Sequence, residues 1–358
     1  MDLKEIFNRP PRILIADDDW LNRDLLQTFL ATSGCEVIAA ADGRAALESA
    51  MDNPPDLALV DVQMPRMDGL TFLAKLMKYY PLPVVVVSSL TPAGSEAAMR
   101  ALELGAVDVI CKPGAAYTVG DVATRLVDSI RAAARAKICA SQSRPEPEQG
   151  SPLEANVLSR IRTTDKVLAI GASTGGTEAI RAILSALPAQ TPGTVIVQHM
   201  PEHFTRTFAQ RMNECSAMEV REAEGGELLR PGLALIAPGN YHLLVRRSGA
   251  QYVAQVKDGP RVHHQRPSVD VLFNSVAKYV GVNAVGVLLT GMGADGAKGL
   301  LAMREAGART IAQDEATCVV YGMPKEAVKL GAAERVLPLN RIPAAILEAF
   351  GTPACVAC

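Results

Sequence analysis

The stretch LLTGMGADGAKGLLAMREAG, residues 288–307, joins an apolar run to a helical pattern through a glycine-rich loop. The apolar residues 284–289 have the length of a buried strand, and the residues after the loop repeat with helical spacing. The glycines between them form a G-x-G-x-x-G, which is the fingerprint of dinucleotide-binding loops. The stretch therefore indicates an α/β fold. It leaves two interpretations of the loop, which either binds a cofactor or presents Asp295 for other chemistry.

Similar alternations of apolar runs and helical patterns fill the chain on both sides of one polar segment. That segment, SQSRPEPEQGSPLEAN at residues 141–156, is rich in Pro, Glu and Ser, so it predicts a flexible linker. We therefore predict a first domain over residues 11–136, a linker over 137–160 and a second domain over 161–351. Buried strands are expected at residues 13–16, 37–40, 57–60, 84–87 and 107–111, and then at 167–170, 195–198, 233–237 and 284–289. Strands that alternate with helices in this way predict two doubly wound parallel sheets.

The composition favours a globular protein of the cytoplasm. The 358 residues are enough for two ordinary domains, and 49% of them are hydrophobic, which allows a sizeable core. A net charge of −2 with mixed signs offers no basic surface for nucleic acid. No apolar run approaches the roughly 18 residues of a membrane span, so membrane insertion is not expected. The seven cysteines show no disulfide framework, which is typical of a reducing compartment.

Polar side chains follow the predicted strands of the first domain. Asp17 and Asp18 end the first strand, Asp61 ends the third, Ser88 ends the fourth and Lys112 ends the fifth. Each acid alone is an ordinary turn residue, but the carboxyl ends of parallel strands meet in one crevice, where ligands bind. Clustered carboxylates need a cation between them, and hard oxygen ligands suit Mg²⁺. One acid would then attack a phosphoryl group, whose charge Lys112 and Ser88 would stabilise.

Four motifs of this domain, ILIADDD, LVDVQMPRMDGL, VVVVSSLT and GAVDVICKP, resemble the receiver domain of two-component response regulators. The resemblance spans about residues 11–136 and implies a flavodoxin-like fold, with a cis peptide bond before Pro113. It also implies that Asp61 is the phosphoacceptor and that a sensor histidine kinase is the phosphodonor. The implied Mg²⁺ ligands are the side chains of Asp17, Asp18 and Asp61 and the backbone carbonyl of Gln63, and the implied phosphoryl-sensing residues are Ser88 and Lys112.

In the second domain, Ser173 lies on a tight glycine turn, IGASTGGTEAI, that leads into a helix. The N–H groups of a helix N-terminus stabilise an oxyanion, so this serine is a candidate nucleophile. The alternative is a helix N-cap, for which Ser and Thr are preferred. His199 closes the strand TVIVQ and Asp295 lies in the glycine loop, so three strand ends supply the residues of a catalytic triad. Their chain order, Ser, His, Asp, differs from the Ser, Asp, His order of the α/β-hydrolases.

A zinc site is one competing interpretation. Residues 199–203, HMPEH, match the H-x-x-E-H motif, which needs both histidines on one helical face. Pro201 favours the first helical position, so we expect His199 before a helix and His203 within it. The two histidines then need not face the same point, and the sequence disfavours a zinc site at this motif.

A dinucleotide site is a second alternative, and a purely regulatory domain in which the glycine loops only pack is a third. The spacing of Asp314 suits a ribose contact, and Tyr321-x-x-x-Lys325 resembles the short-chain dehydrogenase pair. A glycine and a proline interrupt that pair, and proline costs about 3 kcal/mol inside a helix. Asp295 would also lie beside the pyrophosphate as a like charge. The loop of residues 288–307 is therefore better suited to orient a histidine.

The second domain resembles the catalytic domain of chemotaxis protein-glutamate methylesterases from residue 166 to about residue 347. The motifs that carry the resemblance are AIGASTGG, VIVQHMP, IAPGNYHLLV, RPSVDVLFNSVA, LLTGMGADGAKGLLAMREAGA and TIAQDEATCVVYGMPKEAV. It implies a Rossmann-like fold with Ser173, His199 and Asp295 as the triad. Backbone N–H groups of Met292 and Thr174 are the implied oxyanion donors.

Together the two resemblances imply a serine hydrolase that phosphorylation of its receiver activates. Its implied reaction is demethylation of glutamate γ-methyl esters on methyl-accepting chemoreceptors, with deamidation of glutamines by the same acyl chemistry, for sensory adaptation. Mg²⁺ is implied for receiver phosphorylation, and no cofactor is expected for the ester step.

Overall fold

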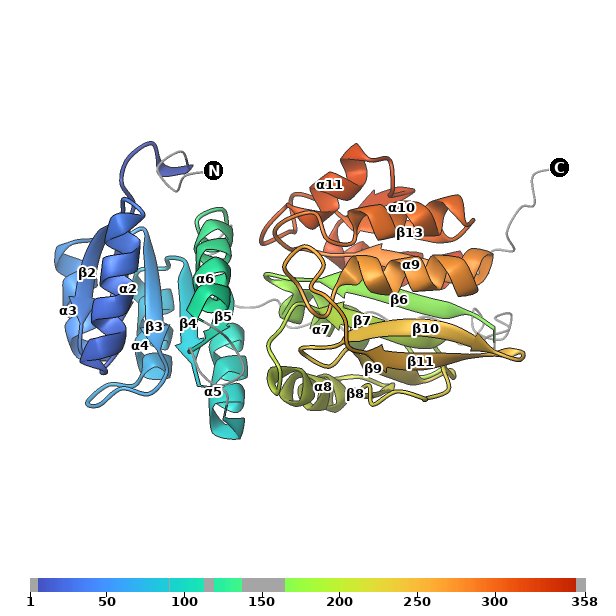
Figure 1. The fold of residues 1–358 in the computed structure, drawn as a ribbon, viewed down its shortest axis with the longest axis horizontal. Coiled ribbons are helices and arrows are strands. Elements are labelled where there is room, and N and C mark those ends of the chain that lie inside the picture. The colour runs from blue at the N-terminus through green and yellow to red at the C-terminus, as the bar shows by residue number, and fades with distance from the viewer. Residues whose placement is uncertain (1–5, 90, 113–118, 137–164, 352–358) are drawn as a thin grey trace. The chain divides into compact units, whose positions relative to one another are not determined.

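The computed structural model describes residues 6–89, 91–112, 119–136 and 165–351 (Figure 1). The chain divides into two compact units, Met1–Arg144 and Pro145–Cys358. The predicted linker lies outside the described residues, as does Pro113 with its implied cis bond. The predicted bounds of the two domains and of the linker stay predictions. None of the helices in the described ranges combines the length and hydropathy needed to cross a membrane.

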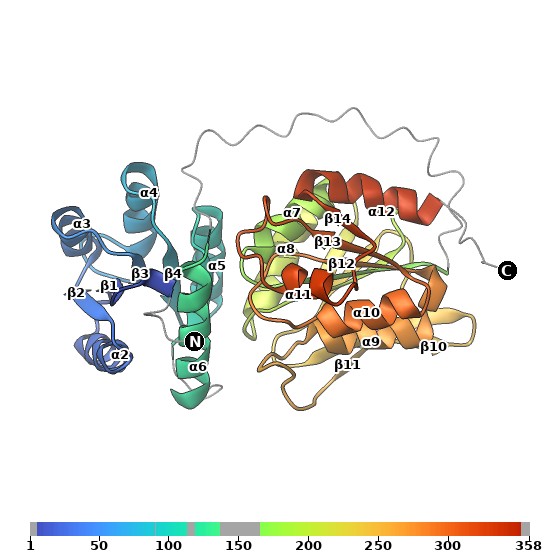
Figure 2. The ribbon, with the colours of Figure 1, turned by 90° about the horizontal axis from the view of Figure 1, so that it is seen from above.

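The first unit is a parallel sheet of five strands in the order β2-β1-β3-β4-β5, which is the flavodoxin-like order. Its strands are β1 Arg12–Ala16, β2 Glu36–Ala40, β3 Leu57–Asp61, β4 Val84–Ser88 and β5 Asp108–Cys111. Its helices are α2 Trp20–Thr32, α3 Gly43–Asp52, α4 Gly69–Tyr79, α5 Pro92–Glu103 and α6 Val119–Ala133. Figure 2 shows α3, α4 and α5 on one face of this sheet and α2 and α6 on the other. All five predicted strands are confirmed.

The second unit is built on a parallel sheet of seven strands in the order β14-β13-β12-β6-β7-β9-β8. The strands are β6 Val167–Ala172, β7 Gly193–Gln198, β8 Glu219–Glu222, β9 Leu233–Ile236, β12 Ala284–Leu288, β13 Arg309–Gln313 and β14 Arg335–Leu337. The chain winds outward from β6 in both directions, so β6 and β12 flank the point where the strand order reverses. Open α/β sheets bind ligands in the crevice beyond the carboxyl ends of the strands at that point.

The helices of the second unit cover both faces of this sheet. They are α7 Gly176–Ala186, α8 Phe204–Cys215, α9 Val269–Tyr279, α10 Ala297–Glu305, α11 Met323–Lys329 and α12 Ile342–Gly351. Figure 2 shows α7 and α12 on one face, and α9 and α10 on the other with an antiparallel hairpin. The hairpin pairs β10 His242–Ser248 with β11 Gln251–Lys257.

Helix α9 packs against β6 and β12 of the sheet and against β10 of the hairpin beside it, and its apolar side chains set its position. Leu272, Phe273 and Val276 are fully buried, and their spacing places them on one helical face. Burial of each such side chain contributes about 1.5–3 kcal/mol to stability. The packing holds the N-terminal end of α9 at the carboxyl edge of the sheet, where the candidate triad lies.

The sequence did not predict β8, β13, β14 or the hairpin. β8 and β14 are edge strands and carry exposed or half-exposed residues in place of a continuous apolar run. The hairpin strands mix buried residues with exposed ones, and β10 ends in the exposed residues Arg246, Arg247 and Ser248. Strands buried on both faces give apolar runs, whereas strands buried on one face give a weaker alternating pattern.

Candidate active site

The predicted phosphorylation site of the first unit lies at the carboxyl edge of its sheet. Asp17 follows β1, Asp61 ends β3 and Lys112 follows β5. The Lys112 Nζ lies 2.7 Å from Asp61 Oδ2 and 3.2 Å from Asp17 Oδ2, and both carboxylates are buried. Strand ends far apart in the sequence thus place two acids and one ammonium in a single cluster.

The electrostatics of this cluster favour a bound cation. Burial raises the pKa of Asp61, although the hydrogen bond and charge of Lys112 oppose the rise. Burial would lower the pKa of Lys112, but its contacts with Asp61 and Asp17 outweigh that effect and raise it. Carboxylate oxygens of Asp17, Asp18 and Asp61 come within 4.8 Å of one another, a hard donor set that suits a divalent cation such as Mg²⁺. The Gln63 N–H donates to Asp61 Oδ1 at 3.3 Å, and the role of the Gln63 carbonyl as a further ligand stays a prediction.

Ser88 lies at the end of β4 but faces a different partner. Its buried hydroxyl donates to the backbone carbonyl of Gly94 at 3.1 Å, at the start of α5. This bond ties the end of β4 to α5, and contact with a phosphoryl group on Asp61 would require the hydroxyl to turn away from it. The predicted phosphoryl-sensing role of Ser88 stays a prediction.

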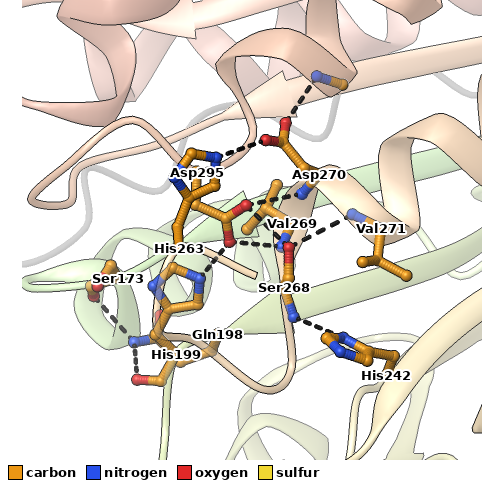
Figure 3. A network of polar contacts seen from close by, with 11 residues as sticks. Ser173, Gln198, His199, His242, His263, Ser268, Val269, Asp270, Val271 and Asp295 are labelled. Carbon is orange, nitrogen blue, oxygen red and sulfur yellow. Dashed lines mark hydrogen bonds and ion pairs between the residues drawn. The ribbon is translucent and has the colours of Figure 1, made fainter. Parts of the chain in front are cut away.

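The three predicted triad residues meet at the carboxyl edge of the seven-stranded sheet (Figure 3). Ser173 follows β6, His199 follows β7, and Asp295 lies in the loop between β12 and α10. Backbone hydrogen bonds connect their loops: Ser173 N donates to the carbonyl of Thr290 at 3.0 Å, and His199 N donates to that of Ala172 at 3.1 Å. The geometry of the site is therefore fixed by backbone contacts between neighbouring strand ends.

The imidazole of His199 is held through one nitrogen. Nε2 lies 2.8 Å from Asp295 Oδ2, and both side chains are buried. Nδ1 is buried and has no hydrogen-bond partner within the described residues. Figure 3 shows the ring between Asp295 and Ser173, so Nδ1 is the nitrogen left to accept a proton. A direct Ser173–His199 hydrogen bond is not formed in the described structure, and such bonds often tighten only when substrate binds.

The carboxylate of Asp295 receives four hydrogen bonds. Oδ1 accepts from Ser268 Oγ at 2.9 Å and from Asp270 N at 3.0 Å, and Oδ2 accepts from Val269 N at 2.8 Å and from His199 Nε2. Burial alone would raise the pKa of Asp295, but the contacts with His199 and the backbone N–H groups of α9 outweigh burial and lower it. The acid is therefore ionised and held in one orientation, as a group that orients an imidazole must be.

The lowered pKa makes part of the stability of this unit depend on pH. Because the folded-state pKa lies below the unfolded value of 3.8, the contribution is fully present above that value and is lost as pH falls through the folded value. We expect Asp295→Asn to lower the unfolding free energy at pH 7 by about 3 kcal/mol, since its amide places N–H against N–H donors. The difference in unfolding free energy between the variant and the wild type should become smaller below about pH 4. Urea unfolding at a series of pH values measures the unfolding free energies of both proteins. A difference that stays constant from pH 7 to pH 3 would contradict the lowered pKa of Asp295.

The turn after β6 presents Ser173 to the site and leaves backbone donors free. Gly175 has φ +76°, a left-handed conformation that favours glycine, and the chain turns there into α7. In the described part of the chain, the N–H groups of Thr174 and Met292 donate to no backbone carbonyl. A nucleophile and two unoccupied donors are the elements of an acyl-transfer site. The oxyanion roles of Thr174 and Met292 stay predictions.

The residues that suggested a zinc site or a dinucleotide site are not arranged as those interpretations require. His203 is exposed and precedes α8 as its N-cap residue with φ +70°, so the expectation that it lies within the helix was wrong. His199 faces Asp295 instead. Tyr321 lies before α11, where Pro324 occupies the first turn, so the Tyr321–Lys325 pair does not form one helix turn. Asp314 uses its carboxylate to bind the N–H and hydroxyl of Thr317.

Comparison with known proteins matches a different family to each of the two units. A family described as CheB methylesterase matches residues 168–346, and a response regulator receiver domain matches residues 13–120. A protein-glutamate methylesterase/protein-glutamine glutaminase of Anaeromyxobacter dehalogenans is 56% identical over 95% of this chain and 95% of its own. The chain belongs to the CheB methylesterase family.

Two further relatives support membership of the CheB methylesterase family. A protein of the same name from Syntrophus aciditrophicus is 51% identical over 92% of this chain and 96% of its own. The crystal structure of the CheB methylesterase catalytic domain of Thermotoga maritima has a TM-score of 0.50 and 38% identity, and the match covers 51% of this chain and 97% of that chain. Both resemblances inferred from the sequence are confirmed, and with them the two parallel α/β folds.

Sequence reasoning missed three residues that hold the acid of the candidate triad in place, directly or through another residue. Ser268, Asp270 and His242 lie in the motifs RPSVDVLFNSVA and IAPGNYHLLV, and none was singled out. A serine before an apolar helical pattern signals an N-cap, and Ser268 does cap α9. That signal predicts the cap but not that its hydroxyl also contacts Asp295, because this contact depends on tertiary structure.

Close packing beneath Ser173 leaves no space for a side chain at Gly291. A Cβ there would lie 2.4 Å from Met323 Sδ and 2.7 Å from Ser173 Cβ. We therefore expect Gly291→Ala to displace Ser173 and to reduce ester hydrolysis roughly a hundredfold. The matched control is Gly351→Ala, where a Cβ meets nothing within 4 Å. Equal activity of the two variants would show that the nucleophile tolerates the shift.

Proposed function

We propose that this chain is a phosphorylation-activated serine hydrolase that demethylates glutamate γ-methyl esters on chemoreceptors and deamidates glutamines there. The observation that carries the proposal is the buried His199–Asp295 pair beside Ser173, in which His199 Nδ1 has no hydrogen-bond partner among the described residues. Its relatives are named for the methylesterase and glutaminase reactions, which share one acyl chemistry. Methyl-accepting chemoreceptors are the proposed substrates, and we place the reaction in the cytoplasm.

In the proposed reaction, Ser173 Oγ attacks the γ-carbonyl carbon of the methylated glutamate. His199 Nδ1 accepts the hydroxyl proton, while Asp295 stabilises the imidazolium through Nε2. The N–H groups of Thr174 and Met292 stabilise the oxyanion. Collapse of the tetrahedral intermediate expels methanol with the proton from His199 and leaves an acyl-serine. Water then attacks that ester, with His199 again as base, and releases the glutamate carboxylate. For glutamine the leaving group is ammonia.

Control of this reaction is proposed to reside in the first unit. A sensor histidine kinase would donate its phosphoryl group to a carboxylate oxygen of Asp61. The side chains of Asp17, Asp18 and Asp61 and the carbonyl of Gln63 would hold Mg²⁺, which neutralises phosphoryl charge when bound. Lys112 already contacts Asp61 and Asp17, so its ammonium is in place to bind an added phosphoryl oxygen.

The test of the proposed function is methanol release from receptor membranes methylated with a labelled methyl group. Wild-type chain should release methanol from these membranes and ammonia from receptors that carry glutamine at the same sites. Unmethylated membranes control for other sources of methanol, and a panel of small esters measures general esterase activity. Hydrolysis of the small esters without release from receptors would refute the substrate assignment while leaving the hydrolase chemistry intact.

A further inference from the structure

Ser268 connects the N-terminus of α9 to the acid of the proposed triad. The residue is fully buried, and its Oγ accepts a hydrogen bond from Val271 N at 3.4 Å as the N-cap of the helix. The same oxygen lies 2.9 Å from Asp295 Oδ1. A serine hydroxyl has one proton, and an ionised carboxylate only accepts, so Ser268 donates that proton to Asp295. The hydroxyl thus has one geometry that satisfies both partners.

The backbone of Ser268 is held from the opposite side by the hairpin. Its N–H donates to His242 Nδ1 at 3.2 Å, and His242 Nε2 donates to the carbonyl of Pro260 at 2.9 Å. These two bonds require the ring proton on Nε2, and His242 is buried at the start of β10. Figure 3 shows Ser268 between His242 and Asp295, so a continuous chain of hydrogen bonds runs from the hairpin through Ser268 and Asp295 to His199.

The remaining contacts of Asp295 also come from the start of α9. Val269 N and Asp270 N donate to the two carboxylate oxygens, which adds the partial positive charge of a helix N-terminus. Asp270 is tied in turn to Gly299 N at 2.6 Å and His263 Nε2 at 3.1 Å. Together with His199 and Ser268, these donors occupy about the four lone-pair positions that a carboxylate offers.

From this arrangement we infer that Ser268 is a positioning residue for ester hydrolysis. Its hydroxyl fixes the rotation of the Asp295 carboxylate and thereby the direction in which His199 Nδ1 faces Ser173. The inference rests on the proposed function. Without the Ser268 hydroxyl, Asp270 N is the one donor that remains on Asp295 Oδ1, and the carboxylate can then turn about its Cβ–Cγ bond. Because Asp295 holds the imidazole through a single nitrogen, that rotation moves the base itself.

The experiment compares variants of Ser268 in the full-length chain with a serine of the same helix. Ser268→Ala and Ser268→Gly both remove the hydroxyl, and glycine keeps nearly the full capping preference, so one variant folds even if the other does not. Ser268→Thr keeps a hydroxyl. The matched control is Ser275→Ala, since Ser275 is also buried in α9 and binds Val245 N and the Leu272 carbonyl, remote from Asp295 in the hydrogen-bond network.

Methanol release should show a roughly tenfold to hundredfold fall in kcat for Ser268→Ala and Ser268→Gly, with KM unchanged. Ser268→Thr should restore most of kcat, and Ser275→Ala should retain wild-type kcat despite lower stability. In NMR spectra, the downfield proton resonance of His199 Nε2–H should shift or broaden in Ser268→Ala and stay unchanged in Ser275→Ala.

Two results would overturn the inference. Wild-type kcat and an unchanged Nε2–H resonance in both Ser268→Ala and Ser268→Gly show that Asp295 does not need the hydroxyl. Equal losses of kcat in Ser268→Ala, Ser268→Thr and Ser275→Ala show a general effect of destabilising α9. If the wild-type chain releases no methanol, the proposed function fails instead, and the resonance still tests the coupling between Ser268 and His199.

Discussion

Replacing Ser173 with alanine should reduce methanol release from methylated receptor membranes roughly 10⁴-fold or more, because the reaction loses its covalent intermediate. Since His199 Nδ1 has no hydrogen-bond partner within the described residues, removal of the Ser173 hydroxyl breaks no hydrogen bond to the imidazole. We therefore expect the unfolding free energy to change by less than about 0.5 kcal/mol. Labelled methanol in single-turnover and steady-state assays measures the loss, and urea unfolding measures the stability.

The control for this prediction is Ser185→Ala. Ser185 lies in α7, the helix that follows Ser173, and its exposed hydroxyl binds the backbone carbonyl of Ala182 and no triad residue. His199→Ala should lose as much activity as Ser173→Ala, since nucleophile and base act as a unit. Asp295→Asn should keep more activity, because the acid only orients and stabilises the imidazole. Near-normal turnover by Ser173→Ala would remove the basis of the proposed mechanism.

Replacing Asp61 with asparagine should abolish stimulation of methanol release by a small-molecule phosphodonor with Mg²⁺, while basal release persists. The variant removes the carboxylate that would carry the phosphoryl group and breaks its ion pair with Lys112 at 2.7 Å. A shift of the chain from about 99:1 in favour of an inactive state to 1:99 needs about 5.5 kcal/mol. A doubly charged phosphoryl group can supply energy of this order because it makes several charge-assisted bonds. The measurement is the ratio of methanol release with and without the donor.

The matched control is Asp68→Asn. Asp68 is an exposed N-cap of α4 in the same motif, and asparagine caps equally well, so stimulation should survive. A fragment that begins near Ser151 should be insensitive to the donor, since it lacks Asp61. Stimulation that persists in Asp61→Asn would show that another residue carries the phosphoryl group. If the donor does not stimulate the wild type either, the first unit acts as a targeting module instead.

The sequence predicted the buried strands that form apolar runs, but it missed the buried strand β13, whose residues RTIAQ include three polar ones. The strands that carry the two sites, such as β3 and β6, are buried on both faces and give unbroken apolar runs. The hairpin β10–β11 has one exposed side, and the edge strands β8 and β14 are short and partly exposed, so their residues give no such run. The strands that carry the candidate site residues were therefore predictable, whereas the hairpin, which holds Ser268 through His242, was not.

The sequence also predicted which residues meet but not how they bind. Ser173, His199 and Asp295 follow from strand ends that share one edge. That Nε2 of His199 faces Asp295, and that Ser88 binds the Gly94 carbonyl, depends on side-chain rotamers in the folded chain. The contact between Ser268 and Asp295 joins two segments that no periodicity connects. These features arise from tertiary packing, which a single sequence does not encode as a local pattern.

The order of strands in the second sheet sets a requirement on loop length. Ser173, the proposed nucleophile, follows β6. This strand lies between β12, which precedes Asp295, and β7, which precedes His199. Neighbouring strands are about 4.8 Å apart, so Asp295 has to reach across β6 to meet His199. The residues between β12 and Asp295, Leu289–Ala294, provide that reach, and an acid placed directly at the end of β12 would stop one strand short. A deletion within Leu289–Ala294 would therefore separate acid from base even if every catalytic side chain remained.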